Sequence, residues 1–147
     1  MKFSRTVAYA VHATLQLAQL ETKGPVPCSR LATEGKMPER FLLQILRNLV
    51  THGILRSTRG VDGGYSLVRP ADQISLLEVI EAIEGPYDAT LEVGSGLSED
   101  SQNKLQTALH NVTNSTRRQL EAIKLSQLLK PPKLPAEEEN AERSSQA

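Results

Sequence analysis

The sequence predicts a mainly helical fold with one small β-hairpin and a long C-terminal helix. Apolar residues recur at helical spacing in several segments, a glycine-rich turn separates two short strand-like runs, and the longest helical pattern comes last. The chain has 147 residues, of which 39% are hydrophobic. We therefore expect one domain with an added arm.

The first predicted helix begins after Ser4 and ends near Leu20. Ser4 is a favourable N-cap residue, and Val7 and Val11 belong to an apolar face with helical spacing. The Gly-Pro pair at 24–25 prevents the helix from continuing.

Two further helices joined by a short turn are predicted next. Ser29 is the expected N-cap of a short helix through Glu34, and residues 35–37 supply the turn. Pro38 suits the first turn of the second helix, which ends at Gly53. The apolar stripe of that helix should face inward and consists of Phe41, Leu42, Ile45, Leu46 and Leu49. This is the helix-turn-helix pattern.

A hairpin and a fourth helix follow. Residues 54–59 and 65–69 are predicted strands, and the turn at 60–64 joins them into a wing. Ser75 is then the expected N-cap of an amphipathic helix that ends at Gly85.

The last helical pattern runs from about Glu99 to Leu129, after a flexible connection over residues 88–98. A helix of that length spans roughly 45 Å, which is too long for so small a domain to bury, so we expect a second copy of the chain to cover it. The predicted dimerisation residues are Leu105, Leu109, Val112, Leu120 and Ile123. Residues 131–147, with three prolines and Glu137–Glu139, are expected to form a disordered acidic tail.

Charge is distributed unevenly, although the formal net charge is zero. Residues 1–70 hold ten basic and four acidic side chains, whereas residues 71–147 hold seven basic and thirteen acidic ones. This split suggests an N-terminal half that faces a polyanion such as nucleic acid. A chance asymmetry in an ordinary soluble protein is the alternative.

Several classes of protein do not fit the sequence. No apolar run approaches the roughly 18 residues of a membrane span, and the N-terminus leads into an amphipathic pattern instead of a signal peptide, so we expect a cytoplasmic protein without a membrane partner. The histidines fall on separate elements, and there is neither a nucleophile–base cluster nor a phosphate-binding Gly-Lys-Ser motif. We therefore expect that the protein is not an enzyme and that it binds neither a metal ion nor a cofactor.

The stretch Ser29–Pro86 resembles the bacterial transcription-regulator family that includes IscR, NsrR and CymR. The motifs that carry the resemblance are Tyr9–Val11, Gly24–Val26, Thr58–Leu67 and Ile74–Ile80. The resemblance implies a winged helix-turn-helix DNA-binding domain over residues 1–87 and a dimerisation helix over 99–130. It also implies a homodimer that binds double-stranded DNA at a partly palindromic operator.

The chain departs from that family in its cysteines. Many members carry three cysteines between the wing-side helix and the long helix, whereas residues 88–104 here contain none. Iron–sulfur clusters are held chiefly by thiolates, so we expect no cluster. The cysteine-free CymR-like group, in which signalling is attributed to partners or metabolites, implies an effector protein or a small metabolite. Cys28 precedes the second helix, where a lowered thiol pKa would suit a redox sensor; a small apolar filler is the alternative.

Candidate DNA contacts fall on the second helix of the motif and on the wing. Glu39, Arg40 and Gln44 would present donors and acceptors to base edges in the major groove; a solvated helix face is the alternative. Arg59 beside Gly60 suits insertion into a narrow minor groove. The expected phosphate contacts are Lys2, Arg5, Lys36 and Arg56.

We therefore interpret the chain as a homodimeric, cluster-free DNA-binding regulator, with repression as the favoured mode. Two alternatives stay open: a winged-helix module that binds an acidic protein, and a small-molecule-responsive regulator with a pocket between the wing-side helix and the long helix. Leu43 stands where some members of the family have a polar base-reading residue, so their operator preference cannot be transferred.

Overall fold

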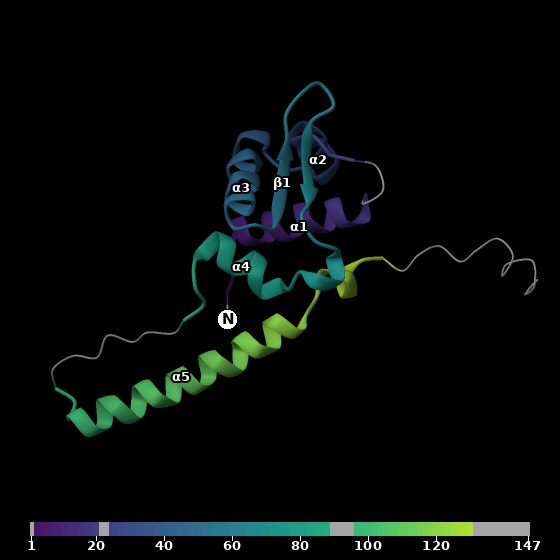
Figure 1. The fold of residues 1–147 in the computed structure, drawn as a ribbon. Helices are drawn as coiled ribbons and strands as arrows, with labels where there is room; N and C mark the ends of the chain where they lie inside the picture. The colour runs from purple at the N-terminus through teal and green to yellow at the C-terminus, as the bar shows by residue number, and fades with distance from the viewer. Residues whose placement is uncertain (1, 21–23, 89–95, 131–147) are drawn as a thin grey trace, which may run out of the picture.

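The computed structural model describes residues 2–20, 24–88 and 96–130, and within them it confirms a mainly helical fold with one hairpin (Figure 1). The elements in chain order are α1 (Arg5–Gln19), α2 (Cys28–Gly35), α3 (Glu39–Thr51), β1 (Leu55–Thr58), β2 (Gly64–Leu67), the 3-10 turn η1 (Ala71–Gln73), α4 (Leu76–Glu84), α5 (Glu99–Ala122) and the 3-10 turn η2 (Leu125–Leu128). The predicted tail 131–147 and residues 89–95 of the predicted connection lie outside the described residues.

Two predicted N-caps are confirmed in atomic detail. The Ser4 hydroxyl accepts a hydrogen bond from the Val7 amide at 3.3 Å. Ser75 forms a reciprocal capping box, because its hydroxyl accepts from the Glu78 amide at 3.1 Å while the Glu78 carboxylate accepts from the Ser75 amide at 2.8 Å. Local sequence is therefore sufficient to start α1 and α4.

The predicted start of α2 is wrong. The helix begins at Cys28 with Pro27 as its N-cap, so Ser29 lies within the first turn. The cause is non-local: Val26 pairs with Tyr65 through backbone hydrogen bonds of 2.9 and 2.8 Å. This pairing fixes the extended chain immediately before Pro27.

The predicted end of the long helix is also wrong. Helix α5 ends at Ala122, and Ile123 adopts an extended backbone conformation. The chain then pairs with the entry to α4, since the Leu76 amide donates to the Ile123 carbonyl at 2.8 Å and the Leu125 amide donates to the Ile74 carbonyl at 3.0 Å. Leu125 is completely buried there. Its apolar character reflects a core position outside the helix.

The hairpin and the helices form one core, and α5 extends away from it. Strands β1 and β2 are antiparallel, with Leu55 opposite Leu67 and Thr58 opposite Gly64. The wing turn projects at the end of the domain opposite α5 (Figure 1). A second apolar cluster joins α1, α4 and α5 through Val7, Leu77, Ile80 and Leu120. None of the described helices is long and apolar enough to cross a membrane.

Candidate nucleic-acid interface

Helix α3 presents a polar face that its own apolar face holds in position. Leu42, Ile45, Leu46 and Leu49 are buried in the core. Residues one turn apart on the opposite face, Arg40, Gln44 and Arg47, are exposed. This division follows from the helical period, and it leaves long polar side chains free to reach a groove of DNA.

The turn before α3 places two more of the predicted residues. Lys36 ends α2 in the left-handed conformation, with φ 52° and ψ 48°, and its side chain is exposed. Glu39 is exposed in the first turn of α3, where a carboxylate is compatible with the helix dipole. Lys36, Glu39 and Arg40 thus lie along a single stretch of the surface.

The wing turn exposes Arg59, as its predicted role requires. Gly60 beside it has φ 114°, a backbone conformation that glycine adopts without strain. At Gly64 a side chain would collide with the Val26 backbone, so this glycine permits the close pairing of β2 with Val26. Arg56 on β1 is exposed as well.

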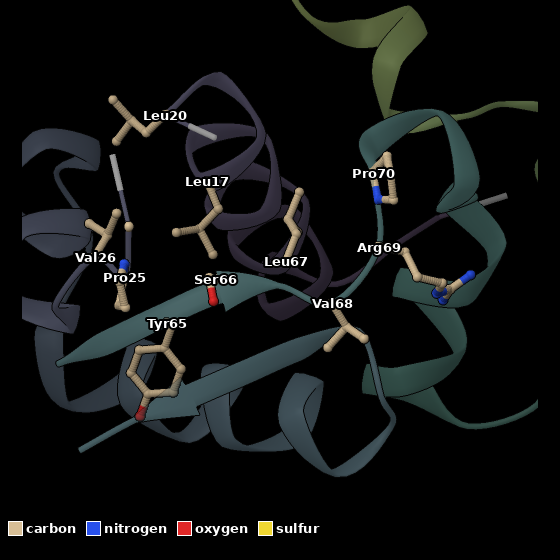
Figure 2. A pocket seen from close by; sticks show the side chains of 11 residues that line it. Leu17, Leu20, Pro25, Val26, Tyr65, Ser66, Leu67, Val68, Arg69 and Pro70 are labelled. Atoms are coloured by element: carbon tan, nitrogen blue, oxygen red, sulfur yellow. The ribbon is translucent and has the colours of Figure 1, made fainter. Parts of the chain in front are cut away.

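A hollow with a mixed polar and apolar lining lies between β2 and the C-terminal end of α1. It has a volume of about 280 Å³, and Leu17, Val26 and Leu67 are among the residues that line it. Figure 2 shows Leu17 and Leu67 on the same side of the β2 ribbon, whereas Arg69 extends toward α4. The hollow thus lies between the end of α1 and the wing strand.

Arg5 lies apart from the other predicted contacts. It is exposed in the first turn of α1, and the backbone amide of its neighbour Ser4 donates to the Glu84 carboxylate of α4 at 3.3 Å. This end of α1 lies away from the wing turn (Figure 1). Lys2, two residues before Ser4, is also exposed.

Phe41 does not face inward as its place in the apolar stripe predicts. Its side chain is 47% exposed and makes an edge-to-face contact with Tyr9 of α1, with ring centroids 6.0 Å apart. The position is at the margin of the stripe, where helical period alone does not decide burial. The result is an aromatic ring beside the polar face of α3.

The environment of Cys28 does not favour redox sensing. Burial, with a further contribution from the negative charge of Glu39, raises the pKa of the thiol. The Sγ atom lies 3.7 Å from the Glu39 backbone carbonyl oxygen. A thiol sensor needs the opposite shift, so the packing role agrees better with the structure.

The predicted dimerisation residues divide into two groups. Leu120 is buried against α1 and α4 of its own chain, and Ile123 contributes its carbonyl to the pairing with Leu76. Leu105 and Leu109 are half-buried, and Val112 is 62% exposed. The outward apolar positions thus lie between Leu105 and Val112, before the buried residues of α5.

Polar contacts fix the second half of α5 to α4. The Arg117 guanidinium donates to the Glu81 carboxylate at 2.9 Å and to the Tyr87 carbonyl at 3.2 Å. At the base of the wing, Arg69 donates to the Glu78 carboxylate at 2.8 Å. Burial raises the pKa of Glu78, but the hydrogen bonds from the Ser75 amide and Arg69 outweigh it, and the net shift is downward.

Comparisons with known proteins agree with this geometry. The profile of the Rrf2 family, described as an iron-dependent transcriptional regulator, matches residues 3–131. A Mycobacterium tuberculosis protein named as an HTH-type transcriptional regulator is 40% identical over 96 residues, which cover 65% of this chain and 60% of that protein's length. The regulator IscR of Cronobacter sakazakii is 32% identical over 125 residues, or 77% of each chain.

The arrangement of the elements also matches a solved structure. CymR of Bacillus subtilis, described as the global cysteine regulator of that organism, superimposes with a TM-score of 0.71 at 24% sequence identity. The match covers 87% of this chain and 95% of CymR. At this level of identity the likeness supports the fold.

Proposed function

Because the chain belongs to the Rrf2 family of transcriptional regulators, we propose that it is a sequence-specific DNA-binding regulator that acts as a homodimer. The observation that carries the proposal is the pairing of two exposed features on one domain. These are the polar face of α3, with Arg40 and Gln44, and the wing turn, with Arg59. This is the arrangement in which a winged helix binds a major groove and the adjoining minor groove together.

Within this proposal the predicted residues have separate tasks. Glu39, Arg40 and Gln44 contact base edges in the major groove, and Arg59 enters the minor groove beside Gly60. Lys36 and Arg56 contact phosphates, which strengthens binding without selecting a sequence. Lys2 and Arg5 lie near the N-terminal end of α1, away from the wing turn. They contact phosphates of the DNA backbone outside the half-site that α3 and the wing bind.

A homodimer is supported by apolar surface that the single chain leaves open. Val112 projects from the middle of α5. A hollow of about 560 Å³ between α1 and α4 is lined by Val7, Val11 and Ile80, among others. A two-fold dimer calls for a two-fold operator, with half-sites about one helical turn, roughly 34–36 Å, apart.

The residues present do not fit an iron–sulfur cluster, although the family is described as iron-dependent. The sequence contains one cysteine, Cys28, and it lies at the start of α2. Among the residues that the structure describes, no three His, Cys, Asp or Glu side chains form a set of metal ligands. We therefore propose a cytoplasmic repressor that has no iron–sulfur cluster and responds to a partner protein or a metabolite.

The test is binding to the DNA upstream of the protein's own gene, against a scrambled duplex, at two salt concentrations. Selective binding that weakens as salt rises supports the proposal, because phosphate contacts release counterions. Equal and weak binding to both duplexes contradicts it. That result would favour the second candidate, a winged-helix module that uses its basic half to bind an acidic protein.

A further inference from the structure

A polar cleft lies where α4, α5 and the base of the wing meet. Its volume is about 380 Å³, which is within the usual range for small-molecule sites. Six of the residues that line it carry charge, three positive and three negative: Arg69, Glu78, Glu81, Arg117, Glu121 and Lys124. Such a lining is suited to a polar ligand with little net charge.

Four of these six charges are already paired. Arg69 pairs with Glu78 at 2.8 Å, and Arg117 pairs with Glu81 at 2.9 Å. Each guanidinium also donates to a backbone carbonyl: Arg69 to that of Gln73 at 2.8 Å, and Arg117 to that of Tyr87 at 3.2 Å. These groups form the fixed wall of the cleft.

The remaining two charges are of opposite sign and belong to neighbouring segments. Glu121 is in the last turn of α5, and Lys124 follows the end of that helix. Neither takes part in the ion pairs formed within residues 2–20, 24–88 and 96–130. Besides the hydrogen bond to Glu81, the charge of Glu121 helps to raise the pKa of Arg117, but no salt bridge among the described residues holds the Glu121 carboxylate. The cleft therefore offers one carboxylate and one ammonium group to a ligand.

We propose that this cleft binds a small zwitterion, of the free α-amino acid class, with its ammonium group at Glu121 and its carboxylate at Lys124. A zwitterion satisfies both charges at once, and an anion or a cation of the same size satisfies only one. Because the charges that line the cleft sum to zero, the cleft does not strongly attract a multiply charged anion.

The position of the cleft connects a ligand to DNA binding, and this part rests on the proposed function. Arg69 comes two residues after the end of β2, and its partner Glu78 belongs to the capping box of α4. Arg117 holds α5, the proposed dimer arm, on the same helix. A ligand held by Glu121 and Lys124 adds contacts beside these ion pairs, and so favours one placement of the wing and the arm. The expected change in operator affinity is about 5- to 150-fold.

The experiment is calorimetric titration of the full chain, without DNA, with each standard L-α-amino acid. Acetate and ethylammonium are the control probes, because each carries only one of the two charges. At least one amino acid is expected to bind with a Kd of about 1 mM or below, and the control probes are not. The proposal is overturned if no amino acid binds the unmodified protein.

Variants locate the binding. Glu121→Gln and Lys124→Met should each weaken it by about tenfold or more, since one charge-assisted contact is lost. The matched control is Asp100→Asn with Lys104→Met, which removes an exposed i,i+4 pair from the same helix and should leave binding unchanged. Circular dichroism checks that every variant folds. Unchanged binding in Glu121→Gln and Lys124→Met overturns the site.

The two proposals fail separately. If the amino acid binds but no operator is recognised, the cleft stands and the proposed function falls. If the operator is recognised but its affinity is the same with and without the bound amino acid, the regulatory role of the cleft is overturned.

Discussion

The guanidinium of Arg117 in α5 donates to the carboxylate of Glu81 in α4 at 2.9 Å, across 36 residues of sequence. The same carboxylate accepts from the Tyr87 amide at 3.0 Å, and Arg117 donates to the Tyr87 carbonyl. Both ion-paired side chains are about a quarter to a third exposed. The Glu81 carboxylate thus holds both the chain at Tyr87, just after α4, and helix α5.

Replacement of Arg117 by Met should lower the free energy of unfolding by a small amount. The pair is partly solvated, which limits its value, but its loss leaves the Glu81 carboxylate with one partner fewer. Urea denaturation measures the change. Lys104→Met, which breaks a largely exposed pair on the same helix, is the control and should have almost no effect.

Replacement of Arg59 by Ala should weaken operator binding by about 1–3 kcal/mol without a change in stability, because the side chain is exposed in the wing turn. Fluorescence anisotropy with operator DNA measures the loss. Arg118→Ala, which removes an exposed cation from α5, should bind normally. Equal binding by wild type and Arg59→Ala would favour the protein-interaction module.

Replacement of Lys36 or Arg56 by Met should reduce the salt dependence of binding and leave sequence preference intact. Each removed phosphate contact lowers the slope of log K against log salt by about 0.9. The measurement is a salt titration on the operator and on a scrambled duplex. A loss of affinity confined to the operator would instead assign the residue to base recognition.

Replacement of Glu78 by Gln should remove part of the acid sensitivity of folding. The pKa of Glu78 is lowered in the folded protein, so its carboxylate stabilises the fold above the ordinary glutamate pKa of about 4.3. That contribution is lost as pH falls through the folded pKa. Unfolding by urea at neutral and acidic pH should show a smaller pH dependence in the variant, whereas Asp62→Asn in the exposed wing turn should match wild type.

Replacement of Val112 by Glu should convert the proposed homodimer to a monomer. Val112 is 62% exposed in the single chain, so a charge there is tolerated until a second copy covers it. Light scattering coupled to gel filtration measures the mass. Val61→Glu, at a fully exposed wing position, should remain dimeric. A dimer that persists in Val112→Glu would place the interface elsewhere.

Local chemistry determined which elements could be predicted from the sequence. The N-caps Ser4 and Ser75 and the inward face of α3 depend on neighbours within one or two turns, and apart from Phe41 the structure has them as predicted. The start of α2 and the end of α5 depend on distant backbone partners, Tyr65 and Ile74. No local pattern reports such partners, so both boundaries were misplaced.

The same distinction applies to the candidate sites. The exposed residues of α3 and the wing follow from helical period and turn chemistry, so sequence reasoning reaches them. The charged cleft combines residues from η1, α4, α5 and the chain beyond α5. The sequence suggested a pocket between α4 and α5, but the pairing of Arg117 with Glu81 requires the fold.

The bridge between Ser75 and Lys124 gives the chain between α4 and Leu125 a fixed departure point and a fixed return point. The buried residues of α5 are Thr113 and Leu120, both in its second half. The first half of α5 therefore has little support from the core, and in the proposed homodimer a partner copy would hold it. In that proposed homodimer, insertions or deletions of whole helical turns there would change the distance between the two DNA-binding domains while leaving each domain intact. Operator spacing could then diverge among relatives by changes in length, independently of the residues that read the bases.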